Sequence, residues 1–327
     1  MKCRVRHAIV GAMALALMAT GSAQASTVTV GSVFPPGSTP TAFSQVQTFF
    51  NTALPEKGAN LTSPVNGTVV RWRVQGAEGG PFRLRILRPN GSGAYTAAGT
   101  SNPATPSDAG LQTFTANLPI RTGDLIGADP SNAADKIGIA EVPGASYGFV
   151  FPPPFDTATV APSGSVSGKE VALSAEVQPT PTIASVVPFF GSVAGGTTVT
   201  ITGTDFNSAS AVKFGTTPAS GFTVESETKI TAIAPPSAEV GPIDVTVTTL
   251  AGTSAGGTAG RFLYEGCVVP KLKKKTLKAA KRAARRDDCK VGKVVRRKKG
   301  SRHVVQQSPK PGKVLPPGSK VNVTLGK

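Results

Sequence analysis

The sequence predicts a mainly β protein divided into several domains. Gly and Pro are frequent, at 37 and 28 of 327 residues, and Val and Thr dominate the apolar segments, a composition typical of short strands joined by turns. Long segments rich in Leu, Ala, Glu and Lys are absent until the C-terminal part. The length is that of roughly two or three ordinary domains. We expect an N-terminal β-sandwich, a second sandwich and a small α+β domain.

Residues 1–25 have the pattern of a secretory signal peptide. Lys2, Arg4 and Arg6 precede an apolar segment at 8–19, and Ala23-Gln24-Ala25 gives a small-residue cleavage pattern. We expect a mature chain beginning near Ser26 and a secreted, extracellular or cell-wall-associated location. No later segment has the roughly 20 apolar residues that a transmembrane helix needs, so no transmembrane segment is expected.

Positive charge is concentrated in the last domain. The whole chain has a net charge of +17. Residues 267–327 contain 20 Lys or Arg and 2 acidic residues, a net charge of +18, whereas residues 26–266 contain 12 and 16, a net charge of −4. Cys267 and Cys289 are the two cysteines left after signal removal, and in an exported chain they predict one disulfide. That disulfide should contribute about 3 kcal/mol in a domain with a thin apolar stripe.

Residues 26–178 have the alternating segments and turn clusters of a β-sandwich. In the strand expected at 69–74, Val70, Trp72 and Val74 should share one face, and the strand at 82–87 alternates in the same way. The short connection between the two strands predicts a hairpin. Further strands are expected at 112–117, 125–128 and 171–177, whereas the three prolines in 149–155 exclude a central strand there.

Polar and aromatic residues of this first domain leave several alternatives open. Four arginines, Arg71, Arg73, Arg83 and Arg85, would share one face of the hairpin, as a solvated surface, which we favour, or as an anion-binding stripe. Trp72 is expected in the core. Weak candidates for ligand contact in loops are Tyr95, Tyr147 and Phe155.

A linker rich in Pro and Thr at 178–182 introduces the second domain. Gly195 and Gly196 should form a turn before a strand whose Val199 and Ile201 face inward, and Gly203 should let the chain leave that strand. The segments that carry a resemblance are Pro181–Gly191, Gly195–Phe206, Ala211–Gly215, Thr228–Pro236, Gly241–Thr249 and Phe262–Tyr264. In this order they resemble the IPT/TIG family, which implies an immunoglobulin-like sandwich at about 179–265.

The last domain should contain a helix followed by three strands. Thr276 is a good N-cap, Leu277, Ala280 and Ala284 recur at helical spacing, and strands are expected at 290–295, 303–307 and 320–325. The segments Val269–Leu272, Thr276–Ala280, Cys289–Val294, Gln307–Gly312 and Gly318–Val321 resemble the PASTA family over residues 267–327. The resemblance implies a bacterial envelope protein that associates with peptidoglycan.

The residues needed for catalysis are scarce, so we expect no enzyme, no cofactor and no metal site. His303 is the one histidine left after signal removal, and it lies among Arg302 and Lys299 on an expected basic hairpin. Three acids occur close together, Asp124, Asp129 and Asp135. They could bind Ca²⁺ or form part of a glycan site, but we favour ordinary turn chemistry.

The positive charge of the last domain exceeds what solubility requires and indicates a polyanion as partner. The candidate binding residues are Lys273, Lys274, Lys275, Arg296, Arg297, Lys298, Lys299 and Arg302. Because the chain is expected outside the cell and lacks interleaved aromatic residues, nucleic acid is not expected. Peptidoglycan or an anionic cell-wall polymer is the expected partner.

These observations favour a non-enzymatic wall-associated protein in which the basic domain tethers and the IPT/TIG-like domain acts as a spacer or interaction module. Two alternatives remain: a carbohydrate-binding or adhesive protein with its specificity in the first sandwich, and a glycan-active enzyme with accessory domains.

Overall fold

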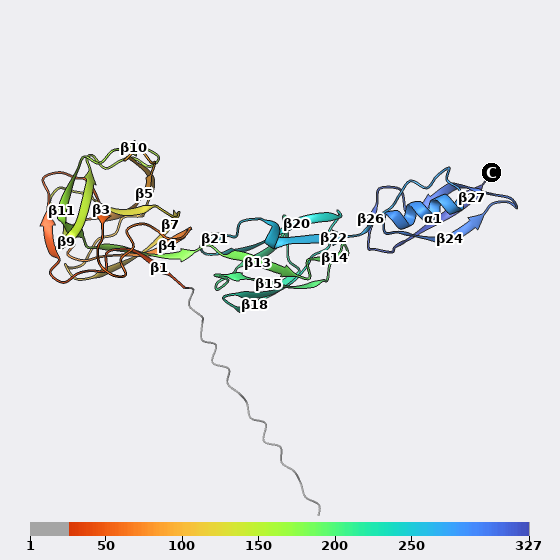
Figure 1. Ribbon diagram of the computed structural model, residues 1–327, viewed down its shortest axis with the longest axis horizontal. Coiled ribbons are helices and arrows are strands. Elements are labelled where there is room, and N and C mark those ends of the chain that lie inside the picture. The colour runs from red at the N-terminus through yellow and green to blue at the C-terminus, as the bar shows by residue number, and fades with distance from the viewer. Residues whose placement is uncertain (1–25, 327) are drawn as a thin grey trace, which may run out of the picture.

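A computed structural model describes residues 26–326; the predicted signal peptide lies outside the described residues. The fold is mainly β, as predicted. Three units follow one another along the long axis of the molecule (Figure 1), each with its own hydrophobic core. No helix among residues 26–326 is long and apolar enough to cross a membrane.

The first unit is a sandwich of two antiparallel sheets. One sheet has, in spatial order, β1 (Val28–Gly31), β12 (Leu173–Pro179), β4 (Gly67–Val74) and β7 (Gln112–Ile120). The other has β10 (Thr159–Val160), β6 (Tyr95–Thr100), β5 (Phe82–Pro89), β8 (Leu125–Pro130), β3 (Thr48–Ala53), β9 (Lys136–Val150) and β11 (Gly164–Val171), with β2 (Thr39–Ala42) paired to β9. Trp72 is fully buried between the sheets and packs on Phe114, as expected for a core residue.

The predicted hairpin between the two arginine-containing strands is wrong. β4 pairs with β12 and β7, whereas β5 pairs with β6 and β8 in the opposite sheet. The short connection therefore crosses from one sheet to the other. In a sandwich a short loop can form a hairpin within one sheet or cross between the two sheets. Alternation of side chains does not specify which strand becomes the neighbour.

The predicted inward position of Val70 is also wrong. Where β4 pairs with β12, Arg71 and Val69 face the consecutive residues Glu176 and Val177, so Val70 is the extra residue of a β-bulge. Val69 is consequently fully buried together with Trp72 and Val74, while Val70 is half-buried.

The middle unit is a smaller sandwich. One sheet has β13 (Thr182–Val187), β15 (Thr198–Thr204), β19 (Lys229–Ile233) and β18 (Gly221–Ser226). The other has β14 (Phe190–Ser192), β22 (Arg261–Glu265), β20 (Gly241–Thr249), β16 (Ala211–Phe214) and β17 (Thr217–Pro218), with β21 (Gly252–Thr253) on β20 and the 3₁₀ turn η1 (Thr258–Gly260) before β22. Val199 and Ile201 are fully buried, as predicted.

Gly203 does not end its strand as expected. It lies inside β15, opposite Ile183, and a side chain there would collide with the Thr182 carbonyl and the Phe206 ring. Glycine is required by this close approach of backbone and not by the exit of the chain.

The C-terminal unit packs one helix on a three-stranded sheet. The sheet has the order β24 (Lys290–Arg296), β27 (Lys320–Gly326) and β25 (His303–Ser308), and β23 (Cys267–Val268) pairs separately with β26 (Val314–Leu315). The helix α1 (Leu277–Arg286) begins after Thr276, whose side chain accepts a hydrogen bond from the Ala279 N–H. The helix, its cap and the three strands are confirmed. The disulfide between Cys267 and Cys289 is also present.

Direct contacts join the units. The Thr68 hydroxyl of the first unit donates to the Ala251 carbonyl of the middle unit at 3.2 Å, and the Gln178 amide donates to the Ser208 hydroxyl at 3.2 Å. At the other junction Val314 of the C-terminal unit packs against the middle core. The middle unit therefore separates the two ends of the molecule (Figure 1).

Candidate functional site

The first basic segment, Lys273–Lys275, is fixed beside the start of β25. The Lys274 N–H donates to the Val304 carbonyl at 2.8 Å, and the Val304 N–H donates to the Lys275 carbonyl at 2.9 Å. An isolated β-bridge between Thr276 and His303 extends this pairing. The segment just before the helix is thus held by backbone hydrogen bonds, and its three side chains are exposed.

The second basic segment, Arg296–Arg302, connects β24 to β25 across the end of β27. Its backbone is fixed there because Arg297 donates to the Leu325 carbonyl at 3.0 Å and Arg302 donates to the Gly326 carbonyl at 3.1 Å. Within the turn the buried Ser301 accepts a hydrogen bond from the Lys298 N–H, and its carbonyl accepts one from the Arg296 guanidinium at 2.7 Å.

The predicted basic hairpin is wrong, because β27 lies between β24 and β25. This topology has a useful consequence for the charges. Arg302 lies two residues before Val304, whose backbone pairs with the first basic segment, so the two segments meet at the start of β25. All eight predicted polyanion-binding side chains are exposed, and none forms an ion pair among the described residues. We define these eight residues as the basic surface.

A hollow of about 310 Å³ lies within the basic surface. Arg297 and Lys298 line one side of it, and Ser301, Val305 and Gly326 complete the wall. The hollow gives an anionic group a place where backbone and cationic side chains are both accessible. The charged side chains near the hollow are all positive, because the acids of this unit, Asp287 and Asp288, follow the C-terminal end of the helix.

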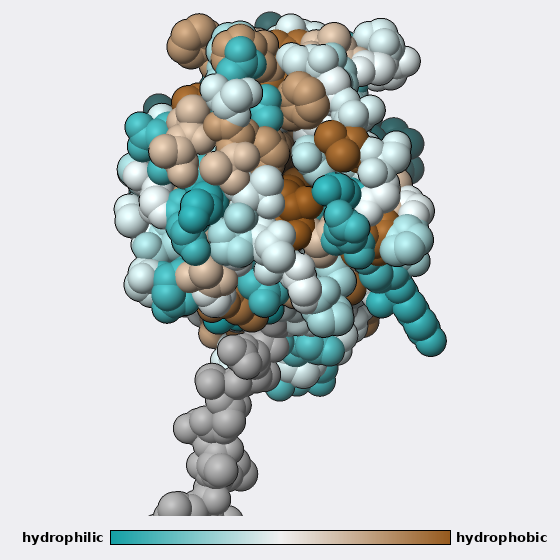
Figure 2. Space-filling view, turned by 90° about the vertical axis from the view of Figure 1, so that its left-hand side faces the viewer, coloured by the Kyte–Doolittle hydropathy of each residue, from teal (hydrophilic) through white to brown (hydrophobic). Residues whose placement is uncertain are grey.

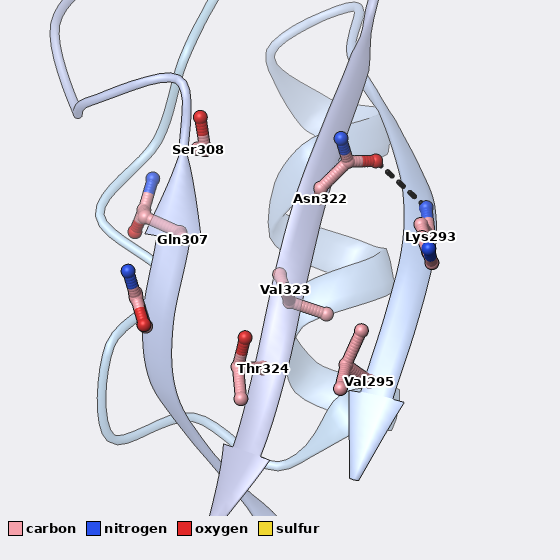
Figure 3. Close-up of a pocket in the computed structure, with 8 residues that line it drawn as sticks. Lys293, Val295, Gln307, Ser308, Asn322, Val323 and Thr324 are labelled. Atoms are coloured by element: carbon pink, nitrogen blue, oxygen red, sulfur yellow. Dashed lines mark hydrogen bonds between the residues drawn. The ribbon is translucent and has the colours of Figure 1, made fainter.

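The sheet face opposite the helix carries a polar groove that sequence reasoning missed. Figure 3 shows Asn322, Thr324, Gln307 and Lys293 around it, with the helix behind the sheet. The groove is small, about 120 Å³. Two of its amides are engaged: Asn322 accepts from the Lys293 N–H at 2.8 Å, and Gln307 accepts from the Leu272 N–H at 2.7 Å. The alternation Val321, Asn322, Val323, Thr324 was the sequence signal for this polar face.

The three acids considered for a Ca²⁺ or glycan site all have partners within the protein. Asp124 forms a bidentate pair with Arg88 at 2.8 Å. Asp135 accepts backbone N–H groups of Gly80, Ser131 and Asn132, and these bonds lower its pKa against the raising effect of burial. The favoured interpretation as turn residues is wrong for Asp129, which lies in β8 and forms a buried ion pair.

The expected arginine face does not exist. Arg71 and Arg73 extend from β4 and both pair with Glu176 of β12. Arg85, in the other sheet, is buried between Asp129 and Asp156. Neither an anion stripe nor a continuous solvated arginine face is formed, because the two strands belong to different sheets.

Of the aromatic candidates for ligand contact, Tyr147 is buried and packs edge-on against Phe49 in the core. Tyr95 is half-buried in β6 against Phe50. Phe155 does extend from a loop, with 87% of its surface exposed. The three prolines beside it follow the end of β9 at Val150, in agreement with the prediction that they interrupt the strand.

Comparison with protein families identifies two of the units. Residues 181–264 match the IPT/TIG domain family, and residues 268–327 match the PASTA domain family. The middle and C-terminal units are an IPT/TIG domain and a PASTA domain. Both resemblances seen in the sequence are confirmed, and both families consist of non-catalytic modules that fit a cell-surface protein.

No curated protein matches the chain. Among solved structures, the extracellular region of plexin A4 matches with 13% sequence identity and a TM-score of 0.24, covering 70% of this chain and 34% of the plexin chain. The chain thus spans about a third of the length of that plexin chain. The basic surface lies within the PASTA domain.

Proposed function

We propose that the chain is a non-enzymatic cell-wall-associated protein whose PASTA domain binds peptidoglycan or an anionic wall polymer through the basic surface. The observation that carries the proposal is the meeting of two separate basic segments at one place, without acidic partners. Exposed like charges repel one another, so a cluster of this kind is more stable when a polyanion lies on it. PASTA domains typically bind peptidoglycan or peptides, which supports the same partner class.

The IPT/TIG domain acts in this proposal as a spacer. It separates the PASTA domain from the first sandwich along the long axis of the molecule (Figure 1). The predicted signal peptide supports a location outside the cell, where wall polymers are accessible. The first sandwich would then be presented at a distance from the attachment site.

The test is binding of the full chain to purified wall sacculi, with and without their anionic polymers. Replacing Arg297, Lys298, Lys299 and Arg302 with glutamine should reduce affinity at least about fourfold, since each exposed charge contact is worth about 0.2–1 kcal/mol. The variant should also show a shallower decrease of binding with salt, because fewer counterions are released.

A matched control removes the same number of charges elsewhere in the PASTA domain, at the exposed Lys281, Arg282, Lys310 and Lys313. This control should keep most of the affinity. Equal losses in both variants would mean that net charge alone decides binding, and failure of the wild-type chain to bind either material would refute the tether. Salt resistance well beyond 0.1 M, where the Debye length is about 10 Å, would indicate a shaped site in place of exposed charge.

One observation favours a second function, carbohydrate binding by the first sandwich. Phe155 is exposed beside an apolar hollow of about 320 Å³ formed with Phe151 and the intervening prolines. Figure 2 views the end of the molecule formed by this sandwich and shows hydrophobic residues interspersed with hydrophilic ones. Exposed apolar patches of this kind mark ligand sites, and aromatic faces stack on sugar rings.

Replacing Phe155 with alanine should abolish binding of the chain to neutral glycans on an array while leaving sacculus binding through the PASTA domain unchanged. Leu111, which is also exposed on the first sandwich, offers a control substitution to alanine. If wild-type protein binds no neutral glycan, or the Phe155 variant binds as well as wild type, the carbohydrate function is excluded at this loop.

A further inference from the structure

An open cleft lies where the first sandwich meets the IPT/TIG domain. Its volume is about 530 Å³, larger than the groove and the two hollows described above. Pockets that bind small ligands occur preferentially at domain interfaces and measure about 300–1,000 Å³. The first sandwich supplies Thr27, Val70, Arg71, Thr115, Glu176 and Gln178, and the IPT/TIG domain supplies Ser208 and Leu250. Because both units line it, the cleft exists only while they keep their relative position.

The floor of the cleft is the outer face of the sheet that contains β4. Trp72 points into the core, so its neighbours Arg71 and Arg73 point out of the sandwich. Arg71 is in register with Thr115 of β7 on one side and with Glu176 of β12 on the other. These three side chains therefore form a row across three neighbouring strands, and all three line the cleft.

The opposite wall consists of two turns of the IPT/TIG domain, which hydrogen bonds fix against the first sandwich. The Gln178 side-chain amide donates to the Ser208 hydroxyl, and the Thr68 hydroxyl donates to the Ala251 carbonyl, both at 3.2 Å. Ala251 directly follows Leu250, so the second bond also positions Leu250, which has 74% of its surface exposed. The strand after this turn, β21, lies at the end of the middle unit that faces the first sandwich (Figure 1).

The charges at the floor of the cleft do not balance. The carboxylate of Glu176 is shared by two arginines, Arg71 and Arg73, so the three side chains together keep one positive charge. Glu176 is the one acid among the residues that line the cleft. The acid of the facing IPT/TIG turn, Asp205, is not among these residues, and it accepts a hydrogen bond from the Ser26 hydroxyl at 3.0 Å. The cleft therefore has an excess of one positive charge.

Arg71 also has hydrogen-bond donors to spare. Its Nε and Nη2 bond to Oε2 of Glu176 at 2.8 and 2.6 Å, whereas no hydrogen bond among the described residues uses its Nη1. The side chain is 43% exposed, so these N–H groups are accessible from the cleft. A guanidinium matches a carboxylate in charge and in geometry. The exposed hydroxyl groups of Thr27 and Thr115 add further polar contacts.

Val70 and Leu250 give the cleft an apolar part. Val70 is the extra residue of the β-bulge, which leaves its side chain half-buried and available to the cleft. One excess positive charge suits a single carboxylate, whereas the basic surface of the PASTA domain suits a polymer with many negative charges. We propose that the cleft binds a small ligand with one carboxylate, which Arg71 holds, and an apolar face that contacts Val70 and Leu250.

The test is calorimetric titration of the full chain with two pairs of compounds. N-acetyl trialanine and its C-terminal amide differ in the carboxylate of a peptide end, and glucuronate and glucose differ in the carboxylate of a sugar. We expect one site per chain with a dissociation constant on the order of 10⁻⁴–10⁻³ M for the acid. Its neutral counterpart should bind at least about tenfold more weakly. The pair that shows this difference identifies the source of the carboxylate.

Arg71→Gln should abolish the preference for the acid, whereas Arg71→Lys, which keeps the charge, should retain part of it. The glutamine variant leaves Glu176 paired with Arg73, so the first sandwich should melt within a few degrees of wild type. Trp72 is the single tryptophan of the chain and lies in the core of this sandwich, so its fluorescence measures that transition directly.

Two further variants separate the site from general effects. Leu250→Ala, at an exposed position, should weaken the binding of the acid and of its neutral counterpart by a similar factor, since it removes apolar contact only. Arg83→Gln removes an exposed arginine from β5 in the opposite sheet and should leave binding unchanged.

Three results would each overturn the carboxylate site at Arg71. These are no binding of any of the four compounds to wild type, equal binding of acid and neutral counterpart in both pairs, and an Arg71→Gln variant that binds as tightly and as selectively as wild type. Sacculus binding through the PASTA domain should be the same in this variant and in wild type, so the outcome here is independent of the proposed tether.

Discussion

Replacing Cys267 and Cys289 together with alanine is expected to lower the free energy of unfolding of the PASTA domain by about 3 kcal/mol. The disulfide joins residues 22 positions apart in sequence and closes the loop that contains the whole helix. For a domain of this size, such a loss corresponds to a melting temperature lower by roughly 12–24 °C. Differential scanning calorimetry, with hydrogen exchange of the helix amides, measures the effect.

The physical reason is the small contribution of the helix to its core. Ala280 and Ala284 are the fully buried helix side chains, and Leu277 is partly exposed. Methyl groups bury little area, so helix docking gains little from the hydrophobic effect. Both cysteines are themselves buried core members, at 0% and 2% exposure, which makes the disulfide part of the packing as well as a chain constraint.

The other two units provide the internal control for this prediction. They contain no cysteine, so the Trp72 fluorescence transition of the first sandwich should be the same in wild type, in the variant and after reduction. A PASTA transition that does not change on removal of the cysteines would show that the helix docks without the disulfide. Since Lys273–Lys275 lie inside the closed loop, loss of the disulfide should also weaken sacculus binding.

The C-terminal unit could be predicted from the sequence nearly element by element, because its signals are local. The Thr276 cap, the spacing of Ala280 and Ala284, and alternation along 320–325 each depend on residues close in the chain. The predicted strand order of this unit was wrong. The short turn between β24 and β25 indicated a hairpin, but β27, near the end of the sequence, lies between them in the sheet.

The first sandwich was predicted as a fold but not in its pairing. A β-bulge at Val70, against β12, put Val69 in the core in place of Val70, and the strands with Arg71 and Arg85 belong to different sheets. Long-range polar contacts were equally inaccessible. Glu176 lies inside the apolar segment 171–177 and pairs with Arg71 and Arg73, about a hundred residues earlier in the chain, and nothing in that segment indicates these partners.

The role assigned to Asp129 shows the same limit, and it leads to the prediction with the largest expected effect. Arg85 and Asp129 are 7% and 6% exposed and form an ion pair at 2.6 Å between neighbouring strands β5 and β8. Replacing Arg85 with methionine should lower the free energy of unfolding of the first sandwich by about 3–5 kcal/mol, because Asp129 remains buried without its partner. Urea unfolding followed by Trp72 fluorescence measures the loss.

Two comparisons separate this cost from a general effect of removing charge. Replacing Arg85 with methionine and Asp129 with leucine together should cost less than the single substitution, since no unpaired charge is left. Removing Lys136 from its half-exposed pair with Glu78 should cost under about 1 kcal/mol. A single Arg85 substitution as mild as that of Lys136 would contradict the buried-charge argument.

The ion pair also connects the core to the exposed loop that carries Phe155. Arg85 donates a second hydrogen bond to Asp156 at 3.0 Å, and Asp156 follows Phe155 directly. Arg85 therefore fixes the loop through Asp156, while Asp129 of the neighbouring strand β8 neutralises the Arg85 charge. Glycan binding by the loop should be weakened in the Arg85 single variant and in the double variant alike, because in both Asp156 loses its ion-pair partner and keeps only the hydrogen bond from the Thr100 hydroxyl. The double variant should nevertheless keep more of its stability.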